Sequence, residues 1–210
     1  MTADTSASTP QTAAILIERP CHAEAVEALL DEAFGPGRFA RTAYRLREGT
    51  IPIPDLSFVA ELGGTPVGAV RLSPITIGGK AALFLGPLVV HPDFKNKGLG
   101  LALMRRSLEA AKAAGHALVI LVGDAPYYAR AGFSPIPAGQ VSLPGPVDPG
   151  RLLANELVDG ALAGVTGMAR PAPFEPGAAE LQLSADSAAL AIPGGGEGSE
   201  QQHETEQAGE

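Results

Sequence analysis

The sequence predicts an α+β (mixed α/β) fold in which helices flank a central, largely antiparallel sheet. Three consecutive runs with strand character are joined by the double-glycine sequences Gly63-Gly64 and Gly78-Gly79, which is typical of an antiparallel meander. Apolar residues recur at helical spacing over 23–34 and again over 98–114. Strands grouped in one part of a chain, with helices before and after them, favour a sheet covered by helices.

The N-terminal part begins with a short apolar run, residues 14–18, which we interpret as the first strand. Pro20 ends this strand, because proline has no N–H group to donate to a strand ladder. Residues 23–34 follow as a helix, and the Gly-Pro-Gly sequence at 35–37 terminates that helix. We predict a second helix over 38–48.

The three runs of the meander cover residues 57–62, 67–77 and 81–90. The third run is almost entirely apolar, as expected for a strand that is buried on both faces of the sheet. The strongest helical pattern of the chain comes next, over 98–114, and Gly115 stands where a C-terminal cap is expected.

The rest of the domain alternates between strand and helix signals. We predict a core strand over 117–122, a short helix over 126–131 and a proline-rich winding connection over 133–149. A final β pair, 152–158 and 162–169, is expected to be joined by its Asp-Gly turn.

The domain organisation follows from a change of composition near residue 172. We expect a disordered lead over 1–12, one folded domain over 13–172, and an acidic, glycine-rich tail over 173–210 that is mostly disordered apart from weak helical character at 178–192. The sequence after Arg170 has no Lys or Arg and eight acidic residues, which equals the whole formal net charge of -8. The folded part is therefore formally neutral.

Composition excludes several classes of function. A neutral body with an acidic tail argues against nucleic-acid binding, which needs a basic surface. Cys21 is the only cysteine, so the chain has no intrachain disulfide and no cysteine-based zinc site, and we expect no metal. No run approaches the roughly 18 apolar residues of a membrane-spanning helix, and residues 1–12 lack the pattern of a signal peptide. We therefore expect a cytoplasmic protein without a membrane partner.

The segment with the clearest chemistry lies between the strand that ends at Val90 and the helix that begins near Gly98. N–H groups at the start of a helix lack intrahelical partners, and the helix dipole adds about half a positive charge there. Gly98 and Gly100 let a bulky anion approach the backbone, and Lys95 and Lys97 add positive charge. This pattern predicts an anion site.

Two common phosphate motifs do not fit this segment. A P-loop requires Lys-Ser or Lys-Thr after its last glycine, whereas Gly100 is followed by Leu-Ala. A dinucleotide-binding fingerprint requires a third glycine where Leu103 stands. Both motifs are excluded.

The segment instead resembles the acyl-CoA signature of the N-acetyltransferase (GNAT) superfamily, Gln/Arg-x-x-Gly-x-Gly/Ala, preceded by a strand that ends Val-x-Pro. Here the signature reads Lys-Asn-Lys-Gly-Leu-Gly at 95–100, after Val90-His91-Pro92. Lys95 departs from the family pattern, since it keeps the positive charge but not the planar donor group. The resemblance covers roughly residues 13–170, and the sequence is most similar to those of the YhbS-type predicted acetyltransferases.

This resemblance implies acetyl-CoA (acyl-CoA) as a cosubstrate and a GNAT-like sheet that is splayed at the acyl-CoA site. A bulge at Gly86-Pro87 would separate the central strand from the strand over 117–122, although the same residues could merely kink a strand edge. The residues that the resemblance assigns to acyl-CoA binding are Leu88, Val90, Lys95, Asn96, Lys97, Gly98, Leu99, Gly100 and Leu101.

A second match supplies the candidate catalytic residues. In this family a tyrosine five residues before the Phe of a Gly-Phe pair protonates the departing thiolate, and Tyr128 has that spacing from Phe133. The alternative for such an aromatic is packing under the cofactor, which suits Tyr127 better. Asp124 is the candidate base, but it also has the position of an ordinary helix N-cap. Glu61 is a weaker candidate, because a carboxylate beside a turn is usually solvated.

The resulting prediction is a direct-transfer acyl-CoA-dependent N-acyltransferase, an enzyme that acts on a small-molecule or peptide amine. Two alternatives remain: a non-catalytic acyl-CoA-binding module, and an acyltransferase that uses longer acyl-CoA or acyl carrier protein donors. The family resemblance allows a homodimer. A segment rich in arginine precedes the meander, where the family often forms its acceptor site, and could attract an acidic acceptor or simply be solvated. Its arginines are Arg38, Arg41, Arg45 and Arg47.

Overall fold

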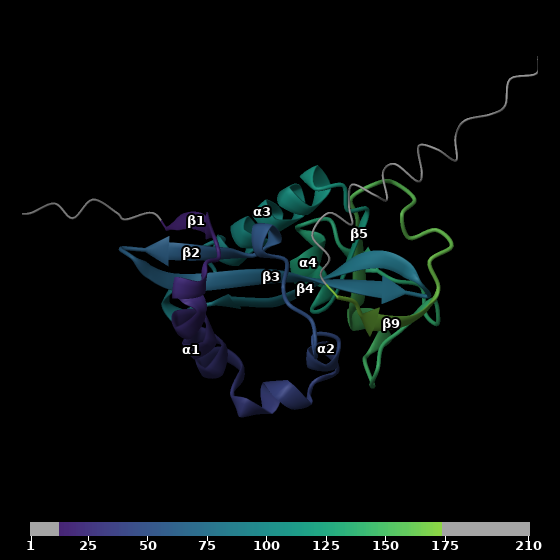
Figure 1. Cartoon of the computed structure of the whole chain (residues 1–210), viewed down its shortest axis with the longest axis horizontal. Coiled ribbons are helices and arrows are strands. Elements are labelled where there is room, and N and C mark those ends of the chain that lie inside the picture. Colours follow the sequence, from purple (N-terminus) through teal and green to yellow (C-terminus); the bar gives the residue numbers. More distant parts are fainter. Residues whose placement is uncertain (1–12, 174–210) are drawn as a thin grey trace, which may run out of the picture.

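The structure, a computed structural model, describes residues 13–173, which form a sheet with helices on both of its faces (Figure 1). The predicted lead over 1–12 and the predicted weak helix over 178–192 lie outside the described residues.

Nine strands make up the sheet. They are β1 (Ala14–Ile17), β2 (Phe58–Leu62), β3 (Thr65–Ile77), β4 (Lys80–Val90), β5 (Leu118–Val122), β6 (Ser134–Pro135), β7 (Val141–Ser142), β8 (Leu152–Glu156) and β9 (Gly167–Pro171). Their order is β1-β2-β3-β4-β5-β8-β6, with β9 pairing with both β3 and β7. All pairings are antiparallel except β4 with β5 and β7 with β9. The predicted mixed, largely antiparallel sheet is therefore confirmed.

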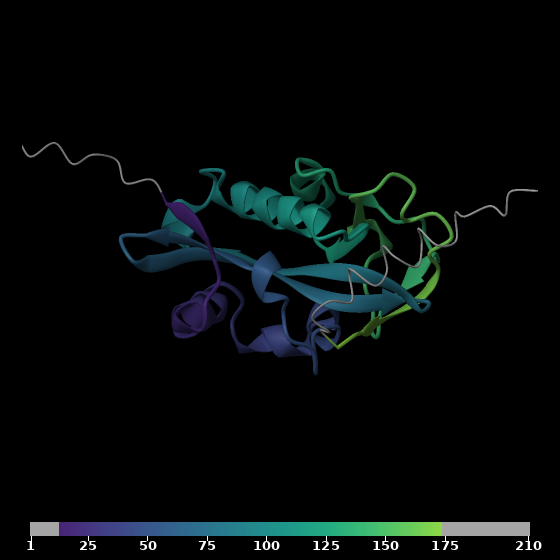
Figure 2. The same cartoon turned by 45° about the horizontal axis from the view of Figure 1, so that its top comes forward.

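The helices divide between the two faces of the sheet. They are α1 (Ala23–Phe34), α2 (Thr42–Arg45), α3 (Leu99–Ala113) and α4 (Ala125–Ala129). Figure 2 shows α3 above the strands and α1 below them, and α2 lies on the same side as α1. The site described below lies where α3, α4 and the loop before α3 meet β4.

Alternating side chains of β2 explain why both faces carry a helix. Successive residues of a strand point to opposite faces. Phe58 and Ala60 join the core that contains Leu103 and Met104 of α3. Val59, between them, packs in the cluster on the other face with the α1 residues Val26, Leu29 and Leu30. Each fully buried aliphatic side chain contributes about 1.5–3 kcal/mol relative to an exposed one, so these two cores fix the helices on the sheet.

The double-glycine turns behave as the sequence predicts. Both glycines of each pair have positive φ angles, 58° and 84° in the first and 57° and 87° in the second. Two consecutive positive φ angles are required by a type I′ turn, whose twist matches that of an antiparallel hairpin. The strands that the turns join, β2 with β3 and β3 with β4, are indeed antiparallel.

The central strands separate halfway along β4. β4 pairs with β5 only at Leu83–Val119 and Phe84–Ile120. Just beyond, the β3–β4 register shifts, so that Gly86-Pro87 stands opposite the single residue Arg71. This is the predicted bulge, and it confirms the predicted splay of the sheet. Residues 86–90 therefore have no strand partner on the β5 side among the described residues.

The predicted final hairpin is wrong. β8 does not pair with β9; it pairs with β5 along Leu118–Val122 and with β6. β9 instead pairs with the distal end of β3. The physical reason is that β5 is apolar on both faces and almost entirely buried, so it requires a partner on its second edge, and β8 supplies three buried side chains there.

The predicted second helix over 38–48 is also wrong in length. The segment forms a 3₁₀ helix at Pro36–Ala40 and the single helical turn α2, separated by Arg41 in an extended conformation. The chain breaks there because Arg38 is drawn back toward α1, where its guanidinium donates to Glu27 and Asp31. Those two ion pairs compete with a continuous helix.

Candidate active site

The loop before α3 presents unpaired backbone N–H groups. Gly98 is the N-cap, with a left-handed backbone (φ 82°), and no side chain caps the helix. Asn96 also has a positive φ, 62°, which asparagine tolerates better than most residues. The first amide to bond to the backbone is that of Ala102, which donates to Gly98 at 3.0 Å, whereas the amides of 96–101 have no backbone acceptor within the described residues. Free amides at a helix start bind anions.

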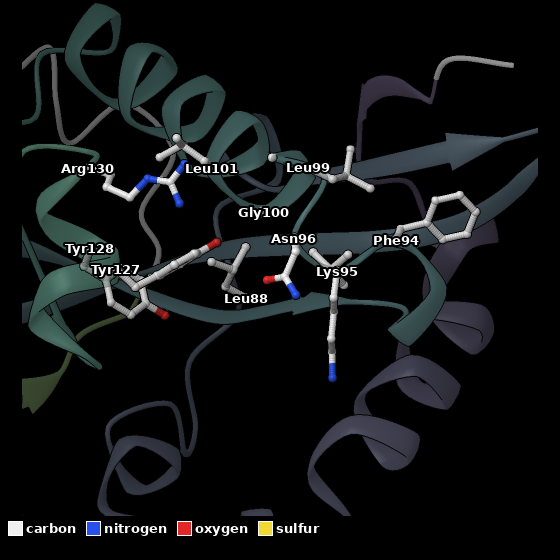
Figure 3. Close-up of a pocket in the computed structure, with 12 residues that line it drawn as sticks. Leu88, Phe94, Lys95, Asn96, Leu99, Gly100, Leu101, Tyr127, Tyr128 and Arg130 are labelled. Atoms are coloured by element: carbon white, nitrogen blue, oxygen red, sulfur yellow. The ribbon is translucent and has the colours of Figure 1, made fainter. Parts of the chain in front are cut away.

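These amides lie at a cavity of about 330 Å³ between the loop, β4 and α4. Figure 3 shows the side chains of Asn96 and Lys95 extending from the loop, and those of Tyr127, Tyr128 and Arg130 extending from α4 and its C-cap. The lining residues are Leu88, Val90, Phe94, Lys95, Asn96, Gly98, Leu99, Gly100, Leu101, Tyr127, Tyr128 and Arg130. The structure thus brings together all the residues predicted to bind the cofactor except Lys97.

The Lys97 side chain packs against a residue of the same loop. Its ammonium nitrogen lies 5.3 Å from the centre of the Phe94 ring, a cation–π contact. The side chain of Lys97 does not line the cavity. The predicted contact of Lys97 with the cofactor therefore stays a prediction.

Arg130 supplies a positive charge that the sequence analysis missed. It follows the last residue of α4 and lines the same cavity as Lys95, with no carboxylate among the lining residues. The signal was present in the sequence, since Arg130 lies three residues after Tyr127, on the same face of a helical turn. A cavity with two cations, free amides and no carboxylate is suited to an anionic group of high charge.

Gly100 makes room at this cavity. A β-carbon at Gly100 would lie 2.5 Å from the Tyr127 hydroxyl oxygen and 3.4 Å from a methyl group of Val90. The hydroxyl of Tyr127 therefore lies directly over the first turn of α3. Burial raises the pKa of Tyr127, so this hydroxyl stays protonated near neutral pH.

Tyr128 is more enclosed than its neighbour. Its ring covers Gly123, where any β-carbon would overlap the ring, and it packs edge-on against Tyr127 and Phe133. Burial raises the pKa of Tyr128 to about 12. The hydroxyl is thus a neutral proton donor over the whole physiological range.

Asp124 occupies the predicted N-cap position of α4 but does not cap it through its side chain. Its main-chain carbonyl accepts from the amides of Tyr127 and Tyr128, both at 3.1 Å. The side chain makes no capping hydrogen bond. A capping side chain usually accepts from the N–H of the second or third helical residue. Here the second is Pro126, which has no N–H, and the N–H of the third, Tyr127, is already bonded to the main-chain carbonyl. The carboxylate is exposed and free to act elsewhere.

A second cavity, of about 320 Å³, lies on the other side of Tyr128 and Leu88, which line both cavities. Asp124 lines this second cavity, at its junction with α4. Three of the four arginines singled out in the sequence, Arg38, Arg41 and Arg47, line it too. Arg45 does not; its guanidinium donates to the carbonyl of Pro144 at 3.2 Å. Glu61 lines neither cavity and lies 3.7 Å from His22.

Between residues 13 and 173, no helix has the length and apolarity needed to cross a membrane. In the same range, no group of three or more His, Cys, Asp or Glu side chains is placed to hold a metal ion.

Comparisons with known proteins agree with this geometry. Residues 23–133 match the model of the acetyltransferase (GNAT) family. The chain is 29% identical over 157 residues to the uncharacterized N-acetyltransferase YhbS of Escherichia coli K12, covering 73% of this chain and 93% of that protein. It is 33% identical over 118 residues to a second uncharacterized N-acetyltransferase of that strain, YjhQ, covering 54% of this chain and 65% of that protein.

Solved structures extend the comparison to ligands. The structure of E. coli YhbS in complex with CoA has a TM-score of 0.68 and 28% identity to this chain, covering 79% of this chain and 92% of that one. A GNAT family acetyltransferase from Brucella melitensis, in complex with acetyl-CoA, has a TM-score of 0.50 and 29% identity, covering 70% of this chain and 97% of that one.

Proposed function

Since this chain belongs to the acetyltransferase (GNAT) family, we propose that it transfers an acyl group, normally acetyl, directly from coenzyme A to an amine. The chain is an N-acetyltransferase by this membership, which argues against the alternative of a non-catalytic acyl-CoA-binding module. Beyond this membership, we propose the acyl donor, the amine acceptor and the roles of individual residues.

The loop cavity is assigned to coenzyme A because its chemistry fits a pyrophosphate. The free amides of 96–101, the missing side chain at Gly100, and the charges of Lys95 and Arg130 all favour an anion that approaches the backbone closely. The open edge of β4 at Leu88 and Val90 supports main-chain contacts to the pantetheine arm, since it has no partner on the β5 side within the described residues. Two relatives of similar fold have CoA or acetyl-CoA bound.

Tyr128 is assigned as the general acid. Transfer forms a bond between the amine nitrogen and the carbonyl carbon and breaks the bond from that carbon to sulfur, so that sulfur needs a proton. The high pKa of Tyr128 keeps its hydroxyl protonated, so that it can donate to the departing sulfur. The proton that the nitrogen loses replaces the one that Tyr128 donates.

Asp124 is assigned as the base that removes a proton from the incoming ammonium group, directly or through water. Its carboxylate lines the second cavity and makes no capping bond. A negative charge there also attracts the ammonium form of the acceptor before deprotonation. The second cavity is thus assigned to the acceptor.

The observation that carries the proposal is the shared wall between the two cavities. Leu88 and Tyr128 line both of them, so a thioester in the first cavity and an amine in the second would meet at the Tyr128 side chain. Direct transfer requires such a meeting, because the reacting atoms must approach to about 3–3.5 Å.

The test is isothermal titration with acetyl-CoA, desulfo-CoA and ADP, followed by an assay of CoA thiol release with a panel of amines. We expect micromolar binding of acetyl-CoA that weakens sharply for ADP, which lacks the pantetheine arm, and amine-dependent thiol release. Absence of binding at millimolar acetyl-CoA would overturn the assignment of the loop cavity. Comparing acetyl-CoA with longer acyl-CoA and acyl carrier protein donors in the same assay tests the predicted alternative donor.

A further inference from the structure

The second cavity has an unusual balance of charge for a site that receives a cationic amine. Four guanidinium groups line it, against the single carboxylate of Asp124. The lining arginines are Arg38, Arg41, Arg47 and Arg151. Three of them lie in the segment 38–47 and the fourth follows more than a hundred residues later, so the full cluster exists only in the folded protein.

Arg38 is already neutralised by the protein. It is 5% exposed and pairs with Glu27 at 3.0 Å and with Asp31. Arg71, on β3, shares Glu27 at 3.0 Å and also pairs with Glu18 at 2.5 Å. These five residues form a network of alternating charges. Arg38 therefore serves as a wall of the cavity and not as a free cation.

Arg47 is outside that network. No Asp or Glu lies within ion-pair distance of it among residues 13–173. Its Nε donates to the carbonyl of Ala43 at 3.1 Å, while its two terminal nitrogens donate to no group in the described chain. An arginine has five N–H donors, so most of the donors of Arg47 are not bonded to groups of the described chain.

The surroundings of Arg47 make its unpaired charge energetically unfavourable. The guanidinium lies 4.8 Å from the ring centre of Tyr44 and 5.8 Å from that of Phe84. Burial lowers the pKa of Arg47 to about 10, and the nearby charge of Arg71 acts in the same direction. The group is still charged at neutral pH, but it has lost part of its hydration without gaining a counterion. An anion in the cavity would restore that balance.

The orientation of Arg47 places its free nitrogens at the bulge of β4. One terminal nitrogen lies 3.8 Å from the position that a β-carbon would have on Gly86. Gly86 lines the same cavity, next to Leu88 on the shared wall. Arg41 and Arg151 are exposed at this cavity, and neither has a carboxylate partner among the described residues.

We propose that the acceptor is a small amine that also carries a carboxylate, an amino-acid-like molecule whose carboxylate is bound by Arg47. This inference rests on the proposed function, because it names the acceptor class for the same reaction. The ammonium group would face Asp124, and the carboxylate would face the terminal nitrogens of Arg47 in a two-point contact. A cavity of about 320 Å³ suits such a small molecule.

The experiment compares matched acceptors that differ only in charge. Acetyl transfer is measured for free amino acids and ω-amino acids, for the corresponding amides, and for aminoalkyl phosphates. We expect kcat/KM to be about 10- to 100-fold higher for a carboxylate than for its amide, the effect of a charge-assisted contact. Amidation lowers the pKa of an α-amine and increases its nucleophilic fraction, so the chemical bias opposes this expectation. A preference for aminoalkyl phosphates over carboxylates would overturn the carboxylate as the recognised anion and would identify a phosphate in its place.

Variants of the arginines test which side chain recognises the carboxylate of the acceptor. Arg47→Gln should abolish the preference for carboxylates with unchanged acetyl-CoA affinity, and Arg47→Lys should restore part of it. Arg45→Gln is the matched control, because it makes the same charge change in the same segment outside the cavity. If Arg47→Gln does not fold, Arg41→Gln and Arg151→Gln, at exposed positions, should still reduce the preference.

The outcomes separate this inference from the proposed function. Turnover with equal kcat/KM for carboxylates and amides would overturn the inference and leave the proposed function intact. Acetyl-CoA binding without turnover of any amine would overturn the proposed function. In that case, titration of amino acids into the CoA-loaded protein still tests recognition of the carboxylate. Binding that is lost in Arg47→Gln supports the anion site. Absence of binding, or binding that is unchanged in Arg47→Gln, overturns it.

Discussion

A β-carbon at Gly100 would lie 2.5 Å from the hydroxyl oxygen of Tyr127, so the first turn of α3 and the short helix α4 are in contact through a residue without a side chain. The neighbour is the far end of a tyrosine side chain, which can move. A substitution there would push Tyr127 into the cavity without disturbing the sheet. We therefore expect a substitution at Gly100 to affect binding more than folding.

We predict that Gly100→Ala lowers the affinity for acetyl-CoA by about tenfold or more, equivalent to about 1.4 kcal/mol. The melting temperature should not fall, because alanine in a helix is favoured over glycine by roughly 0.5–1 kcal/mol. Titration calorimetry and thermal denaturation measure the two effects separately. Adding Tyr127→Phe removes the clashing oxygen, and the double variant should recover part of the affinity. An unchanged affinity in Gly100→Ala would show that no ligand approaches this turn.

The two adjacent tyrosines should differ sharply in catalysis. Tyr128→Phe is expected to reduce kcat by about 100-fold or more, the usual contribution of general acid catalysis, with little change in acetyl-CoA affinity. Tyr127→Phe should change kcat much less and serves as the matched control. Steady-state kinetics with the best acceptor measures both. The opposite ranking would transfer the acid role to Tyr127.

Most of the fold was predictable because its signals are local. The double glycines at Gly63-Gly64 and Gly78-Gly79 fix two hairpins through their positive φ angles, and the apolar spacing of 98–114 fixes α3. The partners of β8 and β9 were not predictable in this way. Their choice depends on which strand edges are left open after β5 and β3 are in place, and that is a property of the whole sheet.

The same division applies to the site. The loop that ends at Gly100 was found because its residues are consecutive and their pattern is distinctive. The pairing state of Arg38 and Arg47 could not be found from sequence, although both stand in one short segment. Only the folded structure shows that carboxylates of α1 neutralise the first and leave the second without a counterion.

Asp124→Ala tests whether this residue acts as a base or as a helix cap. Loss of a capping side chain typically costs about 1 kcal/mol. Because no capping bond is present, the melting temperature should change by less than the 2–4 °C that such a loss produces in a domain of this size. The value of kcat/KM near neutral pH should fall by about 100-fold. A clear loss of stability with normal kinetics would return Asp124 to the capping role.

The pH dependence of transfer follows from two shifted pKa values. Activity should rise with pH as the acceptor amine loses its proton, and it should not fall near pH 10, because the pKa of Tyr128 is raised to about 12 and its hydroxyl stays protonated there. An ordinary tyrosine would titrate at about pH 10. The preference for carboxylate acceptors should instead weaken as the pH rises through about 10, where Arg47 loses its charge. Profiles of kcat/KM for an amino acid and its amide separate the two effects.

Arg47 and Arg38 lie nine positions apart and should have opposite effects on stability. The pKa of Arg47 is lowered in the folded protein, which means that folding disfavours its charged form, and at neutral pH the charge opposes folding. Arg38, in contrast, donates to two carboxylates and to the hydroxyl of Tyr44. Removing Arg38 would leave those carboxylates without their partner.

We therefore predict that Arg47→Met melts no lower than the wild-type protein and up to about 4 °C higher, since methionine fills the space beside Tyr44 and Phe84 without a charge. Arg38→Met, the matched control, should lose about 1–3 kcal/mol, because it removes charge-assisted hydrogen bonds from a largely buried position. Thermal denaturation with and without an amino-acid acceptor measures both changes. The acceptor should stabilise the wild-type protein and not Arg47→Met. A large loss of stability in Arg47→Met would mean that the charge of Arg47 stabilises the fold, and would contradict its assignment to ligand binding.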